Sequence, residues 1–303
     1  MRDYWLTQSL LQAVGIGFGL LALTGLALAL WLPKKWWGKL LGVAVVVFLI
    51  SIPVRKVMQE QATQQVKADD YKERYAKAKA LFDERCKTAG EKIYRTVENV
   101  EAIQLLKIRP LAGDGAGADP MYPGAAMYME RGNEDYIASF LKYETAPQGS
   151  MRGQLSDKPT SLPGYRLVVV VDEVDGKRYG YTKLHDVTNI STDNNNHPLQ
   201  MKKSVLQTGN ARYAVTYEDL LDPEDRKHWV AGTVLAIVDL QTKEVIAEHR
   251  RFLFDNGLGN TSGSRNPWGW AVHNAPSCPK HSGFLGQTTR QFVDQVIKPF
   301  KGE

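Results

Sequence analysis

The N-terminal part of the chain is dominated by two apolar runs. Residues 10–32 contain only two polar side chains. As a helix rising about 1.5 Å per residue, this run would cover roughly 34 Å, enough for a hydrocarbon core of about 30 Å. Residues 38–54 follow a break at Pro33 and are apolar apart from Lys39 and Ser51. The pattern predicts two consecutive membrane spans.

The residues around these runs also favour a membrane location. Four of the seven tryptophans flank them, as expected for an interfacial aromatic belt: Trp5, Trp31, Trp36 and Trp37. The alternatives are a buried pair of core helices and a cleaved signal peptide, but the first run is too long for a signal peptide and a second run follows it. We therefore expect residues 1–54 to form a transmembrane hairpin in contact with the lipid bilayer.

A long helix is predicted after the hairpin, over residues 55–94. Residues 55–65 are mostly polar, without glycine or proline, and read as a stalk. An apolar stripe with spacings of three and four follows it, which indicates one buried helix face: Tyr71, Tyr75, Ala78, Phe82, Cys86, Ala89 and Ile93. Gly90 is an alternative end of this helix.

Residues 95–303 show strand patterns and few helical ones. A strand is predicted over 97–108, a hairpin over 165–172 and 178–183, a strand around 213–217, a hairpin over 231–240 and 245–254, and a final helix from Thr288 that places Phe292, Val296 and Phe300 on one face. Strands that do not alternate with helices favour an antiparallel sheet. We therefore predict an α+β fold in which a mostly antiparallel sheet domain with a C-terminal helix follows the hairpin and the stalk.

Charge is distributed unevenly along the chain. The formal net charge is +5, but the first 54 residues hold four basic residues and one acid. The remaining 249 residues contain 34 basic and 32 acidic side chains. This part lacks the basic excess that a phosphate backbone requires, so a nucleic acid is not an expected partner.

The chain has two cysteines, Cys86 and Cys278, 192 positions apart. They could form a disulfide that ties a C-terminal loop to the stalk helix, or they could be two separate buried thiols. A disulfide would place the domain in an oxidising compartment. Together with the lysines between the two spans, it favours a multi-pass protein of the bacterial inner membrane with a periplasmic C-terminal domain.

The sequence contains no catalytic or phosphate-binding signature. His185, His273 and His281 are the residues that an enzyme or metal site would use, but their spacing matches no established zinc pattern. No Gly-x-Ser-x-Gly elbow or Gly-Lys-Ser/Thr loop is present. We therefore expect no catalytic residue, no metal and no cofactor.

Residues 255–273 form the candidate contact region for a protein partner. This stretch is rich in glycine and asparagine and contains two tryptophans. Long loops often carry binding function, and tryptophan contributes strongly to interfaces. The candidate residues are Asn256, Asn260, Trp268 and Trp270. The alternative is that both tryptophans pack onto the sheet and close the core near Cys278.

Two parts of the sequence resemble a known group of proteins. Residues 75–86 (Tyr-Ala-Lys-Ala-Lys-Ala-Leu-Phe-Asp-Glu-Arg-Cys) with 93–100, and residues 225–232 with the following hairpin, resemble uncharacterised membrane-anchored proteins of Gram-negative bacteria, some associated with type VI secretion effector clusters. The resemblance covers about a third of the chain and carries over no site residue. It implies an envelope-facing binding protein, such as an immunity protein.

These observations support three hypotheses about function. The first is a non-enzymatic, membrane-anchored periplasmic binding protein, for example a toxin-immunity protein. The second is an envelope hydrolase or metal-dependent enzyme that uses His185, His273 or His281. The third is a structural subunit of an inner-membrane assembly.

Overall fold

The computed structural model describes most of the chain. The described residues are 17, 20, 23–31, 33–144, 154–156, 161–172, 175–184, 199–207, 211–280 and 285–301. The chain divides into two compact units, Met1–Glu73 and Arg74–Glu303.

The first unit contains helical residues 23–31 and the beginning of a 51-residue helix, α2 (Trp36–Cys86). The two helical segments pack against each other through small residues. A Cβ atom added at Gly42 would lie 3.1 Å from the Cβ of Ala29, and one at Gly25 would lie 3.5 Å from the side chain of Val46. The absence of side chains at these two glycines allows the helix backbones to approach closely.

The predicted transmembrane hairpin is wrong in this structure. Among the described residues, no helix combines the length and the apolar character that crossing a membrane requires. Residues 38–54 do not form a separate span, because they are the start of α2, which continues into a long polar segment. Of the other predicted span, 10–32, the structure describes residues 17, 20 and 23–31. The finding also overturns the membrane assignment and the predicted multi-pass inner-membrane location with a periplasmic domain.

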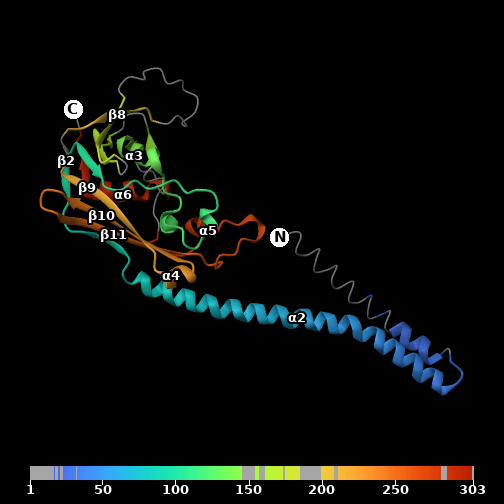
Figure 1. Cartoon of the computed structure of the whole chain (residues 1–303). Helices are drawn as coiled ribbons and strands as arrows, with labels where there is room; N and C mark the ends of the chain where they lie inside the picture. The colour runs from blue at the N-terminus through green and yellow to red at the C-terminus, as the bar shows by residue number, and fades with distance from the viewer. Residues whose placement is uncertain are drawn as a thin grey trace. The chain divides into compact units, whose positions relative to one another are not determined.

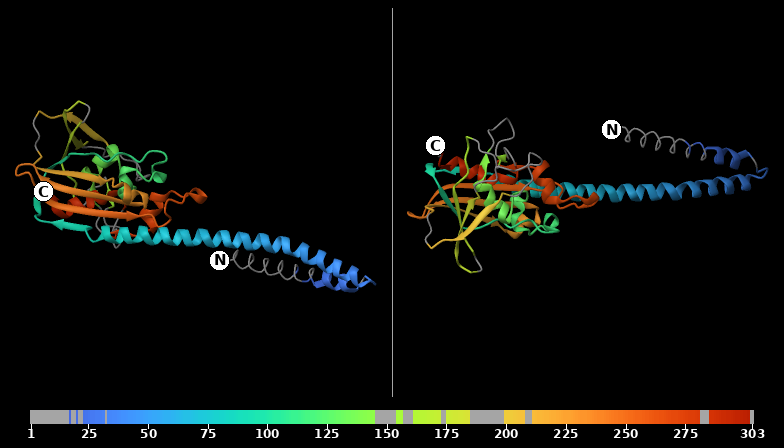
Figure 2. Two further views of the ribbon diagram at one scale, coloured as in Figure 1. Left: turned by 60° about the horizontal axis from the view of Figure 1, so that its bottom comes forward. Right: turned by 90° about the horizontal axis from the view of Figure 1, so that it is seen from above.

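The second unit is a mixed α+β domain built on one large sheet (Figures 1 and 2). Its strands lie in the order β1 (Gly90–Ile93), β11 (Glu244–Phe254), β10 (Val230–Asp239), β9 (Tyr213–Leu220), β3 (Ala102–Leu105), β6 (Leu167–Val171), β7 (Arg178–Lys183) and β8 (Met201–Val205), and β12 (Ser277–Cys278) also pairs with β11. The central strand β3 runs parallel to both β6 and β9. The other pairings in this sheet are antiparallel.

Two smaller strand pairs accompany the main sheet. Strands β2 (Val97–Val100) and β13 (Ile297–Pro299) are parallel, and β4 (Tyr143–Glu144) and β5 (Leu155–Ser156) are antiparallel. The parallel pair brings an early and a late segment of the domain together, because β2 precedes most strands of the main sheet and β13 directly follows the last helix.

Helices cover the main sheet and close the principal core. α3 (Asn133–Leu141) and α6 (Thr288–Val296) contribute buried side chains to the cluster that also takes in β3, β6, β9 and β10. The shorter elements are η1 (Ala116–Ala118), η2 (Pro123–Met127), α4 (Pro223–Lys227), η4 (Ser262–Ser264), α5 (Pro267–Asn274) and η5 (Leu285–Gln287). Figure 1 shows α5 at one end of the domain, near α4.

Local sequence signals located several elements closely. The hairpin predicted over 231–240 and 245–254 is confirmed as β10 and β11, and the predicted final helix is confirmed as α6. However, α6 ends at Val296, so Phe300 lies beyond it. The single strand predicted over 97–108 is two strands, β2 and β3, which belong to different sheets.

The end of α2 packs on the sheet through the predicted apolar stripe. Ala78 and Phe82 are buried, and the Phe82 ring stacks on Phe254 of β11 at a centroid distance of 5.6 Å. The helix ends at Cys86, so the part of the stripe beyond it is not helical. Gly90 begins β1 with φ of +133°. This backbone conformation is unfavourable for residues with a Cβ, so the position requires glycine.

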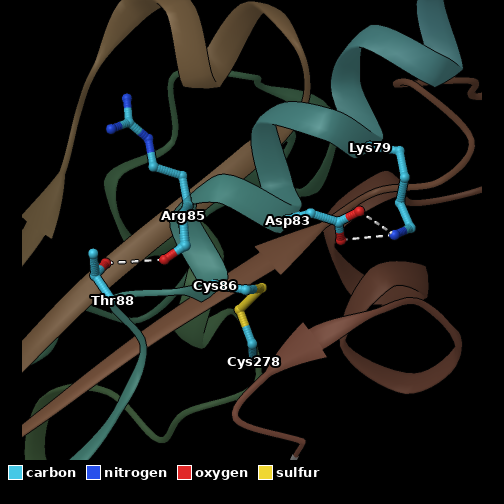
Figure 3. The surroundings of a disulfide bond; sticks show 6 residues. All are labelled: Lys79, Asp83, Arg85, Cys86, Thr88 and Cys278. Atoms are coloured by element: carbon cyan, nitrogen blue, oxygen red, sulfur yellow. Dashed lines mark hydrogen bonds and ion pairs between the residues drawn. A yellow bond between two sulfur atoms is a disulfide. The ribbon is translucent and has the colours of Figure 1, made fainter.

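A disulfide joins Cys86 at the end of α2 to Cys278 in β12 (Figure 3). The two Cα atoms are 5.6 Å apart, and the bond closes a loop of 192 positions. In the pairing of β12 with β11, Cys278 lies opposite Phe252. The disulfide therefore joins the end of α2 to β12, the strand beside β11, on which α2 packs. Two contacts belong to the same end of the helix: Lys79 pairs with Asp83 at 2.6 Å, and the Thr88 hydroxyl donates to the carbonyl of Arg85.

Candidate functional site

The glycine-rich segment after β11 is folded around one buried carboxylate. Asp255 has no exposed surface. Its oxygens accept backbone N–H groups from Gly257 at 3.1 Å and Gly259 at 2.9 Å. The guanidinium of Arg265 closes the segment, with Nη1 3.1 Å from Oδ2 and Nη2 bonded to Oδ1. The loop is therefore tied to the domain at its first and last residues.

The glycine-rich loop packs on the indole ring of Trp229. Gly259 lies against Trp229, and a Cβ atom at that position would be 2.1 Å from the ring. The Trp229 ring in turn packs on Trp268 of α5 at a centroid distance of 5.0 Å. Gly259 also has φ of +78°, so both the backbone conformation and the space require glycine.

Two glycines of the loop provide a matched test of this packing. Gly259 and Gly263 both have positive φ, but a Cβ atom at Gly263 would meet nothing within 4 Å. We expect each alanine variant to lose roughly 1 kcal/mol from the left-handed backbone, and Gly259→Ala to lose about 1 kcal/mol more from collision with Trp229. Urea unfolding of the two variants measures the difference, and equal losses would show that the indole contact does not constrain the loop.

Helix α5 begins at a well-formed cap. The side chain of Asn266 accepts the backbone N–H of Gly269 at 2.8 Å, and Pro267 occupies the first helical position. The other side-chain group of Asn266 donates to the hydroxyl of Tyr128 at 2.8 Å. These bonds hold the start of α5 against the segment that follows η2.

The two faces of α5 have different environments. Trp268 is completely buried, and its Nε1–H donates to the carbonyl of Asp119 at 2.8 Å. Ala271 is buried on the same side. On the outer side, Trp270 keeps 48% of its surface exposed. The guanidinium of Arg265 lies 5.5 Å from the Trp270 ring centroid, within the range of a cation–π contact.

The structure separates the four candidate contact residues that the sequence suggested. Trp268 belongs to the core, as the core alternative required, whereas Trp270 does not. Asn256 is half-buried. Asn260 is exposed, but its side-chain oxygen accepts the backbone N–H of Ser262 at 2.8 Å. Trp270 is thus the candidate that offers a large apolar surface to a partner.

The histidines of the enzyme hypothesis do not come together within the described residues. His185 and His281 lie outside them. His273 is exposed in the last turn of α5. Within the described ranges, no group of three or more His, Cys, Asp or Glu is placed to hold a metal ion. The sequence did not single out His249, which is buried with its Nδ1 2.9 Å from the carboxylate of Glu91.

Sequence reasoning missed Arg265, although a signal for it exists. Asp255 and Arg265 are the only charged residues between the end of β11 and His273, and they bracket the glycine-rich segment. An acid and a base at the two ends of such a segment are well placed to close it. This pairing makes Arg265 part of the surface around Trp270.

A network of buried charges was also missed. Arg109, which follows β3, donates from Nη1 to Asp219 of β9 at 3.1 Å and from Nη2 to the hydroxyl of Thr233 of β10 at 3.0 Å. Its guanidinium stacks over the Tyr217 ring at 3.9 Å. These contacts join the segment that follows β3 to the neighbouring strands β9 and β10.

Glu130 is the unusual member of this interior. Burial raises its pKa from 4.5 to about 7, although Arg109 nearby and the backbone N–H of Thr289 oppose the increase. That N–H donates to the Glu130 carboxylate at 3.3 Å. Burial also lowers the pKa of neighbouring Arg251 to about 10, and the charge of Glu130 opposes that change. Glu130 is only 8% exposed, so its effect is expected on stability rather than on a substrate.

Comparisons of the chain with protein-family models, with curated proteins and with solved structures find no match.

Proposed function

We propose that this protein is a non-enzymatic binding module that holds a protein partner against the outer face of α5. The observation that carries the proposal is Trp270, which is half-exposed on a helix fixed from beneath by the buried Trp268. The term outer face refers here to the exposed residues Asn266, Trp270, His273 and Asn274 together with Arg265.

The outer face has the physical properties of a binding hot spot. Its exposed residues Asn266, Trp270 and His273 follow helical spacings of four and three, so they lie on one side of α5. Tryptophan and arginine are the residue types most enriched among the side chains that dominate binding energy. The cap at Asn266 and the Asp255–Arg265 pair hold these groups in place before binding, which reduces the entropy lost on association.

The charges of this region nearly balance. Arg265 is paired with the buried Asp255, and the exposed residues nearby include both Lys280 and Asp119, whose carbonyl accepts the Nε1–H of Trp268. A partner surface with an apolar pocket surrounded by hydrogen-bonding groups would complement the indole and the polar side chains of the outer face. Capture of a toxin protein, as in an immunity protein, is one concrete form of this function.

Replacing Trp270 by alanine tests the proposal. We expect the full-length variant to lose roughly 2 kcal/mol of partner affinity, about thirtyfold in Kd, because a central indole would leave its pocket empty. Tyr94→Ala is the matched control, because Tyr94 is an exposed aromatic residue of another surface element. The measurement has two stages: affinity capture with wild type and both variants, then titration of the purified captured protein.

The comparison between variants decides the outcome. Support requires a protein that the wild type and Tyr94→Ala retain and that Trp270→Ala loses. Retention of every captured protein by Trp270→Ala would refute the outer face as the contact surface. Loss of the same proteins in both variants would also count against it, because the effect would then not be specific to α5.

A further inference from the structure

A concave site lies at the carboxyl ends of the parallel strands β3 and β6, beside the start of α3. The chain leaves β3 at Leu105 and comes back at α3, where the N–H of Asn133 donates to the carbonyl of Arg109 at 2.8 Å. Together with the beginning of β7, these segments enclose a pocket of about 360 Å³. That volume falls within the range of small-molecule sites, roughly 300–1,000 Å³. Ligands in α/β sheets commonly bind outside the carboxyl ends of parallel strands.

The inner wall of the pocket is apolar and aromatic. Ile137 and Val170 line it from α3 and β6 and are continuous with the main core. Tyr179 and Tyr181 of β7 line it from the side. The Tyr179 ring is held in place, because its hydroxyl donates to Asp175 at 2.7 Å and the ammonium of Lys203 lies 4.0 Å from its centroid. A preformed wall of this kind accepts the apolar part of a small molecule.

Charges of both signs surround the pocket. Among the described residues that line it, Glu134 and Asp172 are acidic and Lys107 is basic. The ammonium of Lys203, which lies over the Tyr179 ring, interacts with Asp172, so Glu134 is the carboxylate left for a ligand. The Lys107 ammonium lies 5.8 Å from the centroid of the neighbouring Tyr217 ring. Glu134 is exposed at the first turn of α3 and forms no ion pair in the part of the chain that the structure describes. A positively charged group entering the pocket would therefore meet a carboxylate at the rim.

We propose that this pocket binds a small organic cation with an aromatic or branched apolar body. The body packs against Tyr179, Tyr181 and Ile137, and the cationic group lies at the rim beside Glu134. The tyrosine rings supply apolar surface for the body of the ligand, since the ammonium of Lys203 already lies over Tyr179. The site is separate from the outer face of α5 and does not depend on the proposed function.

Calorimetric titration of the full-length protein with 2-phenylethylammonium tests the proposal. We expect saturable binding, weaker binding of the neutral analogue 2-phenylethanol, and no binding of the anion 3-phenylpropionate. Glu134→Gln should weaken binding of the ammonium about fivefold, because it removes the rim charge without changing the shape of the side chain. Asp135→Asn is the matched control, since Asp135 is exposed in the same first turn but does not line the pocket.

The two variants change the same charge on the same helix turn, and both sites are exposed, so folding should be preserved in each. Equal effects of Glu134→Gln and Asp135→Asn would overturn the proposal, because the ammonium would then sense only the general field of α3. Binding of the alcohol or the carboxylate as tight as that of the ammonium would overturn the assignment of a cation. Lack of saturable ammonium binding would overturn the site itself.

Discussion

Replacing both Cys86 and Cys278 by serine is expected to lower the free energy of unfolding by about 4 kcal/mol, and by no more than roughly 5 kcal/mol. The bond closes a loop of 192 positions, so its loss frees the unfolded chain to explore many more conformations. Both cysteines also pack against the apolar cluster that contains Phe82, Phe252 and Phe254, so some packing is lost as well. Urea unfolding monitored by circular dichroism measures the difference.

Reduction of the wild type supplies the control for this experiment. With a thiol reductant present, the wild type should unfold at nearly the same urea concentration as the double serine variant, whereas the variant should not respond to the reductant. Equal stability of the oxidised wild type and the variant would show that α2 and β12 are held together without the bond.

The wild type is expected to lose stability between pH 5 and pH 8. Replacing Glu130 by glutamine is expected to remove most of this loss. The folded-state pKa of Glu130 is raised from 4.5 to about 7. Its stabilising contribution is therefore fully present below pH 4.5 and is lost as the pH rises through 7, because the folded state must then hold a buried carboxylate. The shift corresponds to a loss of about 2 to 3 kcal/mol over this pH interval.

Unfolding free energies at pH 5 and pH 8 test this expectation. Glu134→Gln is the control, because it makes the same change in charge at an exposed position and should keep the pH dependence of the wild type. If Glu130→Gln and the wild type lose the same stability between the two pH values, Glu130 does not titrate in this interval and another group is responsible.

The elements that could be recognised in the sequence are those with strong local signals. β10 and β11 surround a Gln-Thr-Lys-Glu turn and consist of β-branched and apolar residues, so both were located within one residue of their observed ends. α6 was located for the same reason, since its apolar positions recur at helical spacing. The helix α3 was missed because it is short and almost entirely buried, which hides the amphipathic pattern.

Strand pairing could not be read in the same way. The pattern of apolar residues in β3 is the same whether the neighbouring strands run parallel or antiparallel to it. Its parallel pairing with β6 and β9 was therefore not predicted. Asn99, with φ of +57°, lies within β2, one residue before that strand ends and the single predicted strand divides. The proposed small-molecule pocket lies where the parallel strands β3 and β6 end side by side, an arrangement that the predicted antiparallel sheet did not contain.

The contrast between Trp268 and Trp270 shows the same limit at the candidate contact surface. Composition identified residues 255–273 as a distinctive stretch with two tryptophans, but the whole stretch was interpreted as a loop, whereas Pro267–Asn274 form the helix α5. Only the packing of α5 against Trp229 and the segment around Asp119 placed one indole in the core and left the other on the surface. The same holds for Cys86 and Cys278, because a disulfide depends on the distance between two segments that are remote in the chain.

Local patterns of apolar, glycine and turn residues thus sufficed for the α+β character, the main hairpin and the last helix, because each arises from interactions between neighbours in the sequence. The long apolar runs, by contrast, led to a predicted hairpin across a membrane that the structure does not bear out. Burial of individual side chains, the order and direction of strands, and the elevated pKa of Glu130 were decided by tertiary contacts, since they depend on groups far apart along the chain.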